Sequence, residues 1–126
     1  MVEAVAPIYH MCRRDEWQAA KAAGEYLGSS QDVADGFIHF SSHEQVVTSA
    51  AKHRAGQDGL VLLCVDPQRL GAALKWEASR GNALFPHLYG PLPVSAVTQT
   101  HDLALGPDGL HQFPPGFPGP DEDIPR

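Results

Sequence analysis

One short segment, residues 36–42, most constrains how this chain can fold. It reads Gly-Phe-Ile-His-Phe-Ser-Ser, so a histidine and two hydroxyls lie in an apolar strand that leads into a helix start. Burying an imidazole or a hydroxyl without a hydrogen bond costs about 1–3 kcal/mol. We therefore expect His39 either to be satisfied by other groups of the protein or to line a pocket in which a ligand satisfies it.

Two further segments repeat this pattern of a histidine beside aromatic residues. They are Ile-Tyr-His at residues 8–10 and Phe-Pro-His-Leu-Tyr-Gly at residues 85–90. Aromatic and imidazole side chains commonly line small-molecule sites, where a few polar groups fix the orientation of the ligand. The three motifs together predict one shared site.

Size and charge limit the possible partners. A chain of 126 residues with 43% hydrophobic residues is long enough for one domain with a real core and too short for two. The net charge is −6, and lysines and arginines form no basic run, which disfavours nucleic acid as a partner. The sequence gives no indication of oligomeric state.

Cysteine use and hydropathy predict a cytoplasmic location. Cys12 and Cys64 are far apart and lack CxxC spacing, so we expect reduced thiols. The longest strongly apolar run, residues 60–65, is far shorter than the roughly 20 residues that span a bilayer, and no charged-then-apolar leader opens the chain.

The first third of the chain predicts two strands and one helix. A short strand is expected over residues 8–11, a helix from Arg13 to about Gly24, and a second strand over residues 37–40. Residues 25–35 show no clear period and are expected to form a surface loop that could cover a site.

Ser41 and Ser42 have two possible roles. Each begins a capping-box pattern, Ser-x-x-Glu and Ser-x-x-Gln respectively, which predicts that a helix begins here and ends near residues 53–56. The free amides of a helix start also bind anions, so both serines are candidate ligand contacts as well.

The second half of the chain predicts mainly strands. Residues 60–65 are continuously apolar and should form a central strand. The other predicted elements are a strand over 74–77 exposed on one face, a polar turn over 79–82, a loop or edge strand over 85–90 because of its proline, and a strand over 94–103.

This order of elements predicts one α+β domain. Strand, helix, strand and helix are followed by several strands without a helix between them, which is typical of a mainly antiparallel or mixed sheet. We assign residues 1–113 to this single domain and residues 114–126 to a disordered tail, because the tail is rich in proline, glycine and acidic residues and poor in apolar surface.

The succession of motifs over roughly residues 7–113 resembles a bacterial family known only as domain-of-unknown-function family 952. The residues that carry the resemblance are Ile8-Tyr9-His10, Trp17, Gly24-Glu25-Tyr26, Gly36-Phe37-Ile38-His39 with Ser41, Leu60-Val61-Leu62-Leu63, Trp76-Glu77 and Phe85 to Leu92. The resemblance implies a fold similar to the ADP-ribosyltransferase superfamily. That fold has a split, twisted, mainly antiparallel sheet with two flanking helices and a nicotinamide cleft between its halves.

The resemblance also implies roles for individual residues. Tyr9 and His10 match the Tyr-His start of the histidine-type enzymes, in which the histidine orients the nicotinamide ribose of NAD. His39 and Ser41 resemble the element that supports the pocket wall. Glu77 is the candidate for the glutamate that stabilises the ribosyl cation, although it lies one strand earlier than the family pattern places that residue.

We therefore expect a histidine-lined cleft that binds a small molecule, with NAD or a related nucleotide as the possible cofactor and no resident metal. The candidate catalytic residues are His10, His39, Glu77 and His87, and the candidate ligand-binding residues are Tyr9, Ser41, Ser42, Phe85 and Tyr89. Each has an ordinary alternative, such as a hydrogen-bonded core histidine or a solvated carboxylate. Because Tyr9 and His10 alternate along a strand, only one of them should face inward.

Three functions remain open from the sequence. The first is binding of NAD or another ADP-ribose-bearing ligand, with ADP-ribosyl-transfer-like chemistry. The second is a non-catalytic module that senses such a nucleotide or mediates an interaction. The third is a metal-dependent hydrolase in which His10, His39 and His87 hold zinc.

Overall fold

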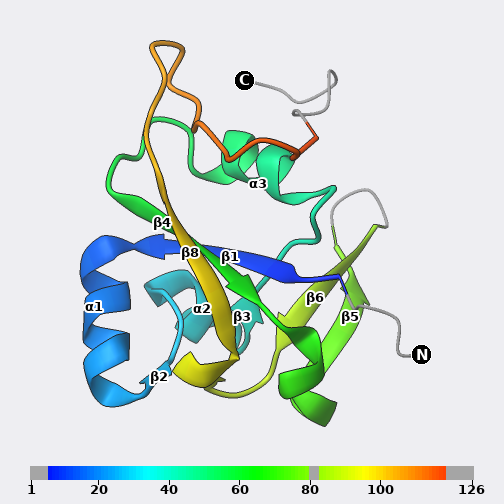
Figure 1. Cartoon of the computed structure of the whole chain (residues 1–126). Coiled ribbons are helices and arrows are strands. Elements are labelled where there is room, and N and C mark those ends of the chain that lie inside the picture. Colours follow the sequence, from blue (N-terminus) through cyan, green and yellow to red (C-terminus); the bar gives the residue numbers. More distant parts are fainter. Residues whose placement is uncertain (1–5, 80–82, 119–126) are drawn as a thin grey trace.

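A computed structural model describes residues 6–79 and 83–118 of the chain (Figure 1). The helices are α1 (Arg14–Ala23), α2 (Ser30–Asp35) and α3 (Val46–His53). The strands are β1 (Ile8–Arg13), β2 (Glu25–Tyr26), β3 (Ile38–His39), β4 (Leu60–Val65), β5 (Leu74–Ala78), β6 (Leu84–Leu88), β7 (Leu92–Pro93) and β8 (Val97–Leu103). All of the strand pairs are antiparallel, which confirms the predicted α+β class.

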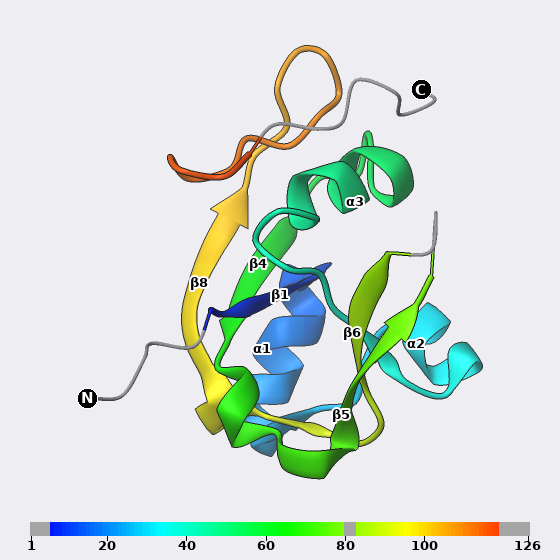
Figure 2. The ribbon, with the colours of Figure 1, turned by 90° about the vertical axis from the view of Figure 1, so that its right-hand side faces the viewer.

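The strands form two three-stranded sheets and one short pair. Their orders are β1-β4-β8, β3-β6-β5 and β2-β7. Figure 2 shows β4 and β8 standing apart from β5 and β6. The two larger sheets meet at a bridge between Tyr9 of β1 and Ser41, which follows β3, and each backbone N–H donates to the other residue's carbonyl at 2.8 Å. Residues 36–42 thus pass from one sheet to the other.

The core lies on both faces of β4, as its continuous apolar sequence predicts. All six of its residues are buried. Val61, Leu63 and Val65 belong to a cluster that includes Trp17 of α1, whereas the alternate residues pack in a second cluster with residues of α3. A strand covered on both faces shows no polar alternation, because side chains of both parities must be apolar.

Two predicted helix boundaries have different outcomes. Gly24 ends α1 with φ +89°, a left-handed conformation that glycine adopts without strain, as predicted. The helix predicted to begin at Ser41 or Ser42 is α3, and it begins later, at Val46. The Gln45 side chain accepts from the backbone N–H of Ser42 at 3.0 Å, but the Ser41 hydroxyl bonds to Ser49 at 2.9 Å, so Ser41 caps no helix.

The surface loop predicted over residues 25–35 is wrong. The segment forms β2 and α2, so the described residues contain three α-helices where two were predicted. Ser29 and Asp32 form a capping box at the start of α2, and Gly36 ends the helix with φ +86°. A helix of six residues is too short to show the 3.6-residue period from which helices are recognised.

The loop or edge strand predicted over residues 85–90 is also wrong, because β6 lies between β3 and β5. Proline is tolerated here at the point where pairing with β3 ends. The carbonyl of Pro86 accepts from the backbone N–H of Phe40 at 2.9 Å, while the ladder pairs of β3 are with His87 and Leu88. Pro86 therefore supplies an acceptor at the end of the ladder, where its missing donor is not required.

Some predictions reach the limits of the described residues. Of the predicted turn over 79–82, residues 80–82 lie outside them, as do residues 119–126 of the predicted tail. Within the described part of the tail, Phe117 packs against Tyr9 with ring centroids 5.2 Å apart, and the tail boundary stays a prediction. Cys12 and Cys64 are free and buried. Among the residues that the structure describes, no helix has the length and apolar character needed to cross a membrane.

Candidate functional site

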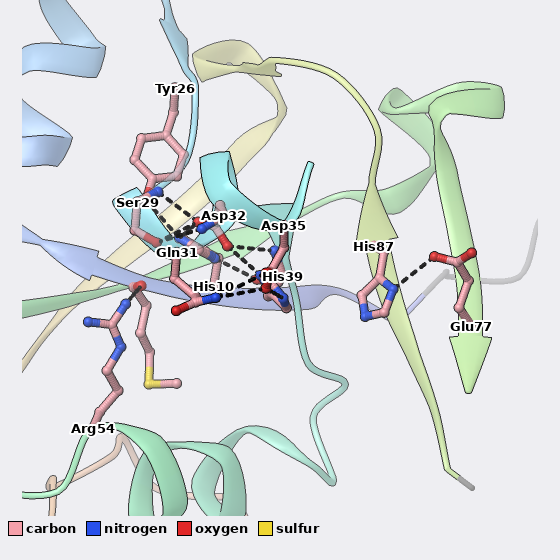
Figure 3. Close-up of polar contacts among 11 residues, drawn as sticks. His10, Tyr26, Ser29, Gln31, Asp32, Asp35, His39, Arg54, Glu77 and His87 are labelled. Carbon is pink, nitrogen blue, oxygen red and sulfur yellow. Dashed lines mark hydrogen bonds and ion pairs between the residues drawn. The ribbon is translucent and has the colours of Figure 1, made fainter. Parts of the chain in front are cut away.

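His10 lies at the centre of a buried network between the two larger sheets (Figure 3). Its ring is 4% exposed. Nδ1 donates to the carbonyl of His39 at 2.6 Å, and Nε2 accepts from the Tyr26 hydroxyl at 2.8 Å. Burial lowers the pKa of His10, which keeps the ring neutral and fits one donating and one accepting nitrogen. Both nitrogens are thus used by the protein.

The prediction that only one of Tyr9 and His10 faces inward is wrong. Both are buried, because β1 is covered on its two faces. Tyr9 packs in the α3 cluster and His10 points the other way, towards Tyr26 and Phe40. Tyr9, a predicted ligand-binding residue, is therefore separated from the histidine network by the sheet itself.

Asp32 of α2 is a buried carboxylate held by four hydrogen bonds. Its side chain is 3% exposed. The backbone N–H and hydroxyl of Ser29 donate to Oδ2 at 2.7 and 3.0 Å, and the backbone N–H and ring Nδ1 of His39 donate to Oδ1 at 3.1 and 2.5 Å. Burial alone would raise the pKa of Asp32, but the hydrogen bonds from His39 and Ser29 outweigh it and hold the pKa well below its ordinary value. Asp32 is ionised.

His39 lies between two carboxylates, and both favour the protonated form of its ring. Its Nδ1 contacts Asp32, and its Nε2 lies 3.0 Å from Asp35 Oδ2. The hydrogen bond to Asp32 is the main cause that raises the pKa of His39. Its side chain is 40% exposed, so the ring links the buried network to the surface.

A second polar group, made of the buried His87 and the more exposed Glu77 and Tyr89, lies on the face of the β3-β6-β5 sheet that also carries His39. His87 Nδ1 lies 2.9 Å from Glu77 Oε1, and the Tyr89 hydroxyl donates to the same oxygen at 2.7 Å. These hydrogen bonds, that from Tyr89 first, lower the pKa of Glu77. Glu77 is therefore an ionised carboxylate, and among the described residues its Oε2 takes part in no hydrogen bond or ion pair.

Strand register explains why these side chains meet. His87 of β6 is opposite His39 of β3 and Lys75 of β5, and Glu77 is opposite Phe85, so all five side chains project from one face of the sheet. Phe37 and Tyr89, which flank the strands, join them. We call the seven residues Phe37, His39, Lys75, Glu77, Phe85, His87 and Tyr89 the aromatic face.

Phe37 connects the two polar groups. Its ring stacks on His87 with centroids 4.2 Å apart and an interplanar angle of 26°, and it lies 4.6 Å from the ring of His39 and 5.2 Å from that of Tyr89. His39 and His87 themselves are in edge contact at 5.7 Å. The structure thus places the three predicted histidines in one continuous arrangement, with His10 beneath His39 and His87 beside it.

The remaining predicted residues lie in three places. Phe85 and Tyr89 lie on the aromatic face with the catalytic candidates, whereas Ser41 is in the bridge to Tyr9. Ser42 lines a pocket of about 340 Å³ with His43, Glu44 and Trp76. This pocket, and another of about 370 Å³ between α3 and residues 106–113, contain none of the four predicted catalytic residues.

Among the described residues, 6–79 and 83–118, no group of three histidine, cysteine or acidic side chains is arranged so that it could hold a metal ion. His10 and His39 direct their ring nitrogens at protein oxygens. The three imidazoles therefore do not converge on a point as zinc ligands do.

The sequence interpretation missed Tyr26, Asp32, Asp35 and Phe37 as site residues. Asp32 had a detectable signal, because Ser29-x-x-Asp32 is a capping-box pattern and Gly36 is a glycine that can end a short helix. Phe37 was seen only as an apolar strand residue. Tyr26 had no local signal, because its partner His10 is 16 residues away.

The fold and site define a class, an α+β protein with antiparallel sheets and a charged His–Asp network where the two larger sheets meet. The chain belongs to the family described as "Protein of unknown function (DUF952)", whose profile matches residues 11–100. This confirms the family inferred from the motifs.

Solved structures of one relative match the chain. The crystal structure of protein CC0527 from Caulobacter crescentus has 57% sequence identity and a TM-score of 0.82, and the match covers 84% of this chain and 93% of that one. A crystal structure of its double mutant matches with 56% identity, the same coverage and the same TM-score. Its solution NMR structure matches with 57% identity, a TM-score of 0.76 and coverage of 84% and 91%. No curated protein matches the chain.

Proposed function

We propose that this protein binds NAD or another ADP-ribose-bearing nucleotide at the aromatic face and carries out ADP-ribosyl-transfer-like chemistry there. The proposal extends the resemblance to the ADP-ribosyltransferase superfamily, with its split antiparallel sheet. The observation that carries it is Glu77, an ionised carboxylate fixed by His87 and Tyr89 beside three aromatic rings.

Glu77 has the charge that this chemistry requires. When nicotinamide leaves NAD, positive charge develops on the ribose carbon and its ring oxygen, and a preorganised anion stabilises that charge. Tyr89 and His87 hold Oε1 of Glu77, which leaves Oε2 without a partner among the described residues. The carboxylate would thus meet the cation without having to reorganise.

Neighbouring residues suit the other parts of such a ligand. Phe37 and Tyr89 offer rings for stacking on a base. Lys75, whose Nζ lies 5.4 Å from the Tyr89 ring centroid, supplies a positive charge for a diphosphate. Neither His39 nor His10 has an unused ring nitrogen, because Asp32 and Asp35 engage those of His39 and the His39 carbonyl and Tyr26 engage those of His10, so both act as positioning residues.

A calorimetric titration with ADP-ribose and NAD tests the binding. Saturable binding by the native protein, lost in Phe37→Ala and retained in Leu27→Ala, is expected, because Leu27 is exposed and lies outside the aromatic face. At 100 times the dissociation constant, a ligand stabilises the fold by about 2.7 kcal/mol, so a thermal melt gives a second measurement. Absence of binding by the native protein would overturn the proposal.

Release of nicotinamide from NAD tests the chemistry. Glu77→Gln keeps the shape of the side chain and removes its charge, so turnover should fall by about 10²–10³-fold, as for the loss of one preorganised electrostatic group. Glu25→Gln, an exposed substitution on β2, is the matched control and should keep full turnover.

A non-catalytic nucleotide-sensing module is the second candidate function. It is favoured by the exposure of Glu77, whose side chain is 38% exposed, because a reactive ribosyl cation is normally shielded from water in an enclosed site. Binding of ADP-ribose without any release of nicotinamide would select this candidate over the enzyme.

A further inference from the structure

We infer that His87 is the general base of the site and that its Nε2 takes the proton from an O–H acceptor, either water or an alcohol. This inference rests on the proposed function for its reaction. The protonation pattern of the ring that it requires can be measured in the protein alone.

The contact with Glu77 fixes the tautomer of His87. An ionised carboxylate only accepts hydrogen bonds, so the 2.9 Å contact requires that His87 Nδ1 donates. In a neutral ring the other nitrogen, Nε2, then carries a lone pair. Nε2 has no hydrogen-bond partner among the described residues, and it is not one of the sealed polar atoms in that part of the chain.

The ring is also held in place. His87 is 6% exposed, lies within the central strand of its sheet, and stacks on Phe37 at 4.2 Å. A base fixed by a carboxylate on one nitrogen and open on the other is the arrangement that enzymes use to activate a hydroxyl. The two carboxylate oxygens of Glu77 thus have different roles, since Oε1 positions His87 and Oε2 remains for the substrate.

The other two histidines cannot take this role in the geometry described. Both nitrogens of His39 face carboxylates, so both donate and neither accepts. Both nitrogens of His10 are bonded to His39 and Tyr26 inside the core. Among the three histidines of the motifs, His87 alone has a ring nitrogen that has no hydrogen-bond partner among the described residues.

The proposed step is balanced without a further reactant. The bond between the ribose carbon and the nicotinamide nitrogen breaks, and its electron pair leaves with nicotinamide. The acceptor oxygen bonds to the same carbon, and its proton moves to His87 Nε2. Nothing is oxidised or reduced, and with water as acceptor the products are ADP-ribose, nicotinamide and a proton.

Nitrogen-15 NMR of the histidine rings tests the inference in the absence of nucleotide. The native protein should show a proton on His87 Nδ1 and none on Nε2, and Glu77→Ala, which removes the acceptor of Nδ1, should abolish this preference. His101→Gln, which removes a ring outside the site, serves for assignment and as the control. A native ring protonated at Nε2 would overturn the inference.

Kinetics provide the second test. His87→Gln should lower kcat for nicotinamide release by about 100-fold or more with little change in KM. Unchanged kcat in this variant would overturn the inference even if nucleotide binds. If the native protein binds no nucleotide, the proposed function fails instead, and the ring measurement alone then decides whether His87 is held as a base.

Discussion

Asp32 is a buried charge whose solvation is replaced almost entirely by protein donors. Four hydrogen bonds from Ser29 and His39 saturate its two oxygens. Taking an unpaired carboxylate out of water is costly, and it is tolerated only when such donors are present. The carboxylate therefore connects α2 to the strand that carries His39.

Removing the charge of Asp32 should destabilise the protein. We expect Asp32→Asn to lower the free energy of unfolding by about 2 kcal/mol, because hydrogen bonds to a charged group are lost and the new amide hydrogens face donors. Urea denaturation measures the change. Asp35→Asn is the matched control, since Asp35 is 36% exposed and its ion pair with the same histidine should be worth less than about 1 kcal/mol. Equal losses in the two variants would contradict this account of Asp32.

The pair of Asp32 and His39 should also give the stability a pH dependence of known sign. The pKa of His39 is raised above 6.5 in the folded state, so its contribution is present below pH 6.5 and is lost as the pH rises through the folded value. The pKa of Asp32 is lowered below 3.8, so its contribution is present above pH 3.8 and is lost as the pH falls through the folded value. The stabilisation by the pair is therefore greatest between pH 3.8 and pH 6.5.

Urea titrations of the native protein and His39→Gln from pH 4 to pH 9 can measure this effect. The difference in the free energy of unfolding should be largest near pH 5–6 and should shrink above pH 6.5. Using the difference between the two proteins removes the opposite contribution of His10, whose lowered pKa makes folding less favourable below pH 6.5 in both. A difference that grew with pH would refute the assignment.

At the scale of elements, the position of α2 depends on its capping box and on the close approach of Gly28 to the Asp32 side chain. Gly28 has φ +100°, and a Cβ built on it would lie 2.6 Å from the Cβ of Asp32. Gly24 has a similar φ of +89°, but a Cβ there would meet nothing within 4 Å. The two glycines thus share their conformation and differ in the space around them.

Gly28→Ala should therefore cost more than Gly24→Ala. Both substitutions strain the left-handed backbone by about 1 kcal/mol, and the close approach at Gly28 should add about 1 kcal/mol or more because Asp32 has to move. Thermal unfolding of both variants gives the comparison, and nucleotide titration of each shows whether the shift reaches His39. Similar losses of stability would show that Asp32 adjusts freely.

How far the sequence predicts an element depends on the length of its pattern. The apolar run of β4 and the helix that ends at Gly24 are visible because six to ten residues repeat one signal. α2 has six residues and no repeat, so only its caps could reveal it. The contact between Glu77 and His87 needed the pairing of β5 with β6, which the proline in β6 concealed.

The candidate site was predictable as a set of residue types but not as a network. His39 and His87 were identified from their aromatic neighbours, and both lie on the aromatic face. The satisfaction of His10 by Tyr26 depends on a long-range contact that no local pattern encodes. Sequence alone therefore could not separate the fully hydrogen-bonded His10 from the two histidines of the aromatic face.

At the scale of the whole molecule, residues near the end of the described chain close over α3 and β1. The Phe117 ring lies 5.2 Å from that of Tyr9, 4.7 Å from that of His43 and 5.5 Å from that of Phe113. These contacts extend the core cluster of α3 beyond residue 113. The segment thus contributes apolar burial although its composition is that of a tail.

Phe117→Ala should reduce stability measurably. Complete truncation of a buried phenylalanine costs about 3–5 kcal/mol, and for this partly buried ring we expect about 1–2 kcal/mol. Urea denaturation with Leu27→Ala as the control distinguishes this loss from a surface effect, because Leu27 is 63% exposed. If both variants unfold like the native protein, the segment does not pack in solution.

The bridge between Tyr9 and Ser41 fixes the register between the β1-β4-β8 sheet and the chain that leaves the β3-β6-β5 sheet. Successive side chains of a strand point to opposite faces, so a slip of one residue at this pair would turn His10 towards α3 and Tyr9 towards Asp32. The hydrogen bond from the His10 ring to the His39 carbonyl can form only in the observed register. This side-chain hydrogen bond therefore selects the strand register in which His10, His39 and the buried carboxylate of Asp32 meet.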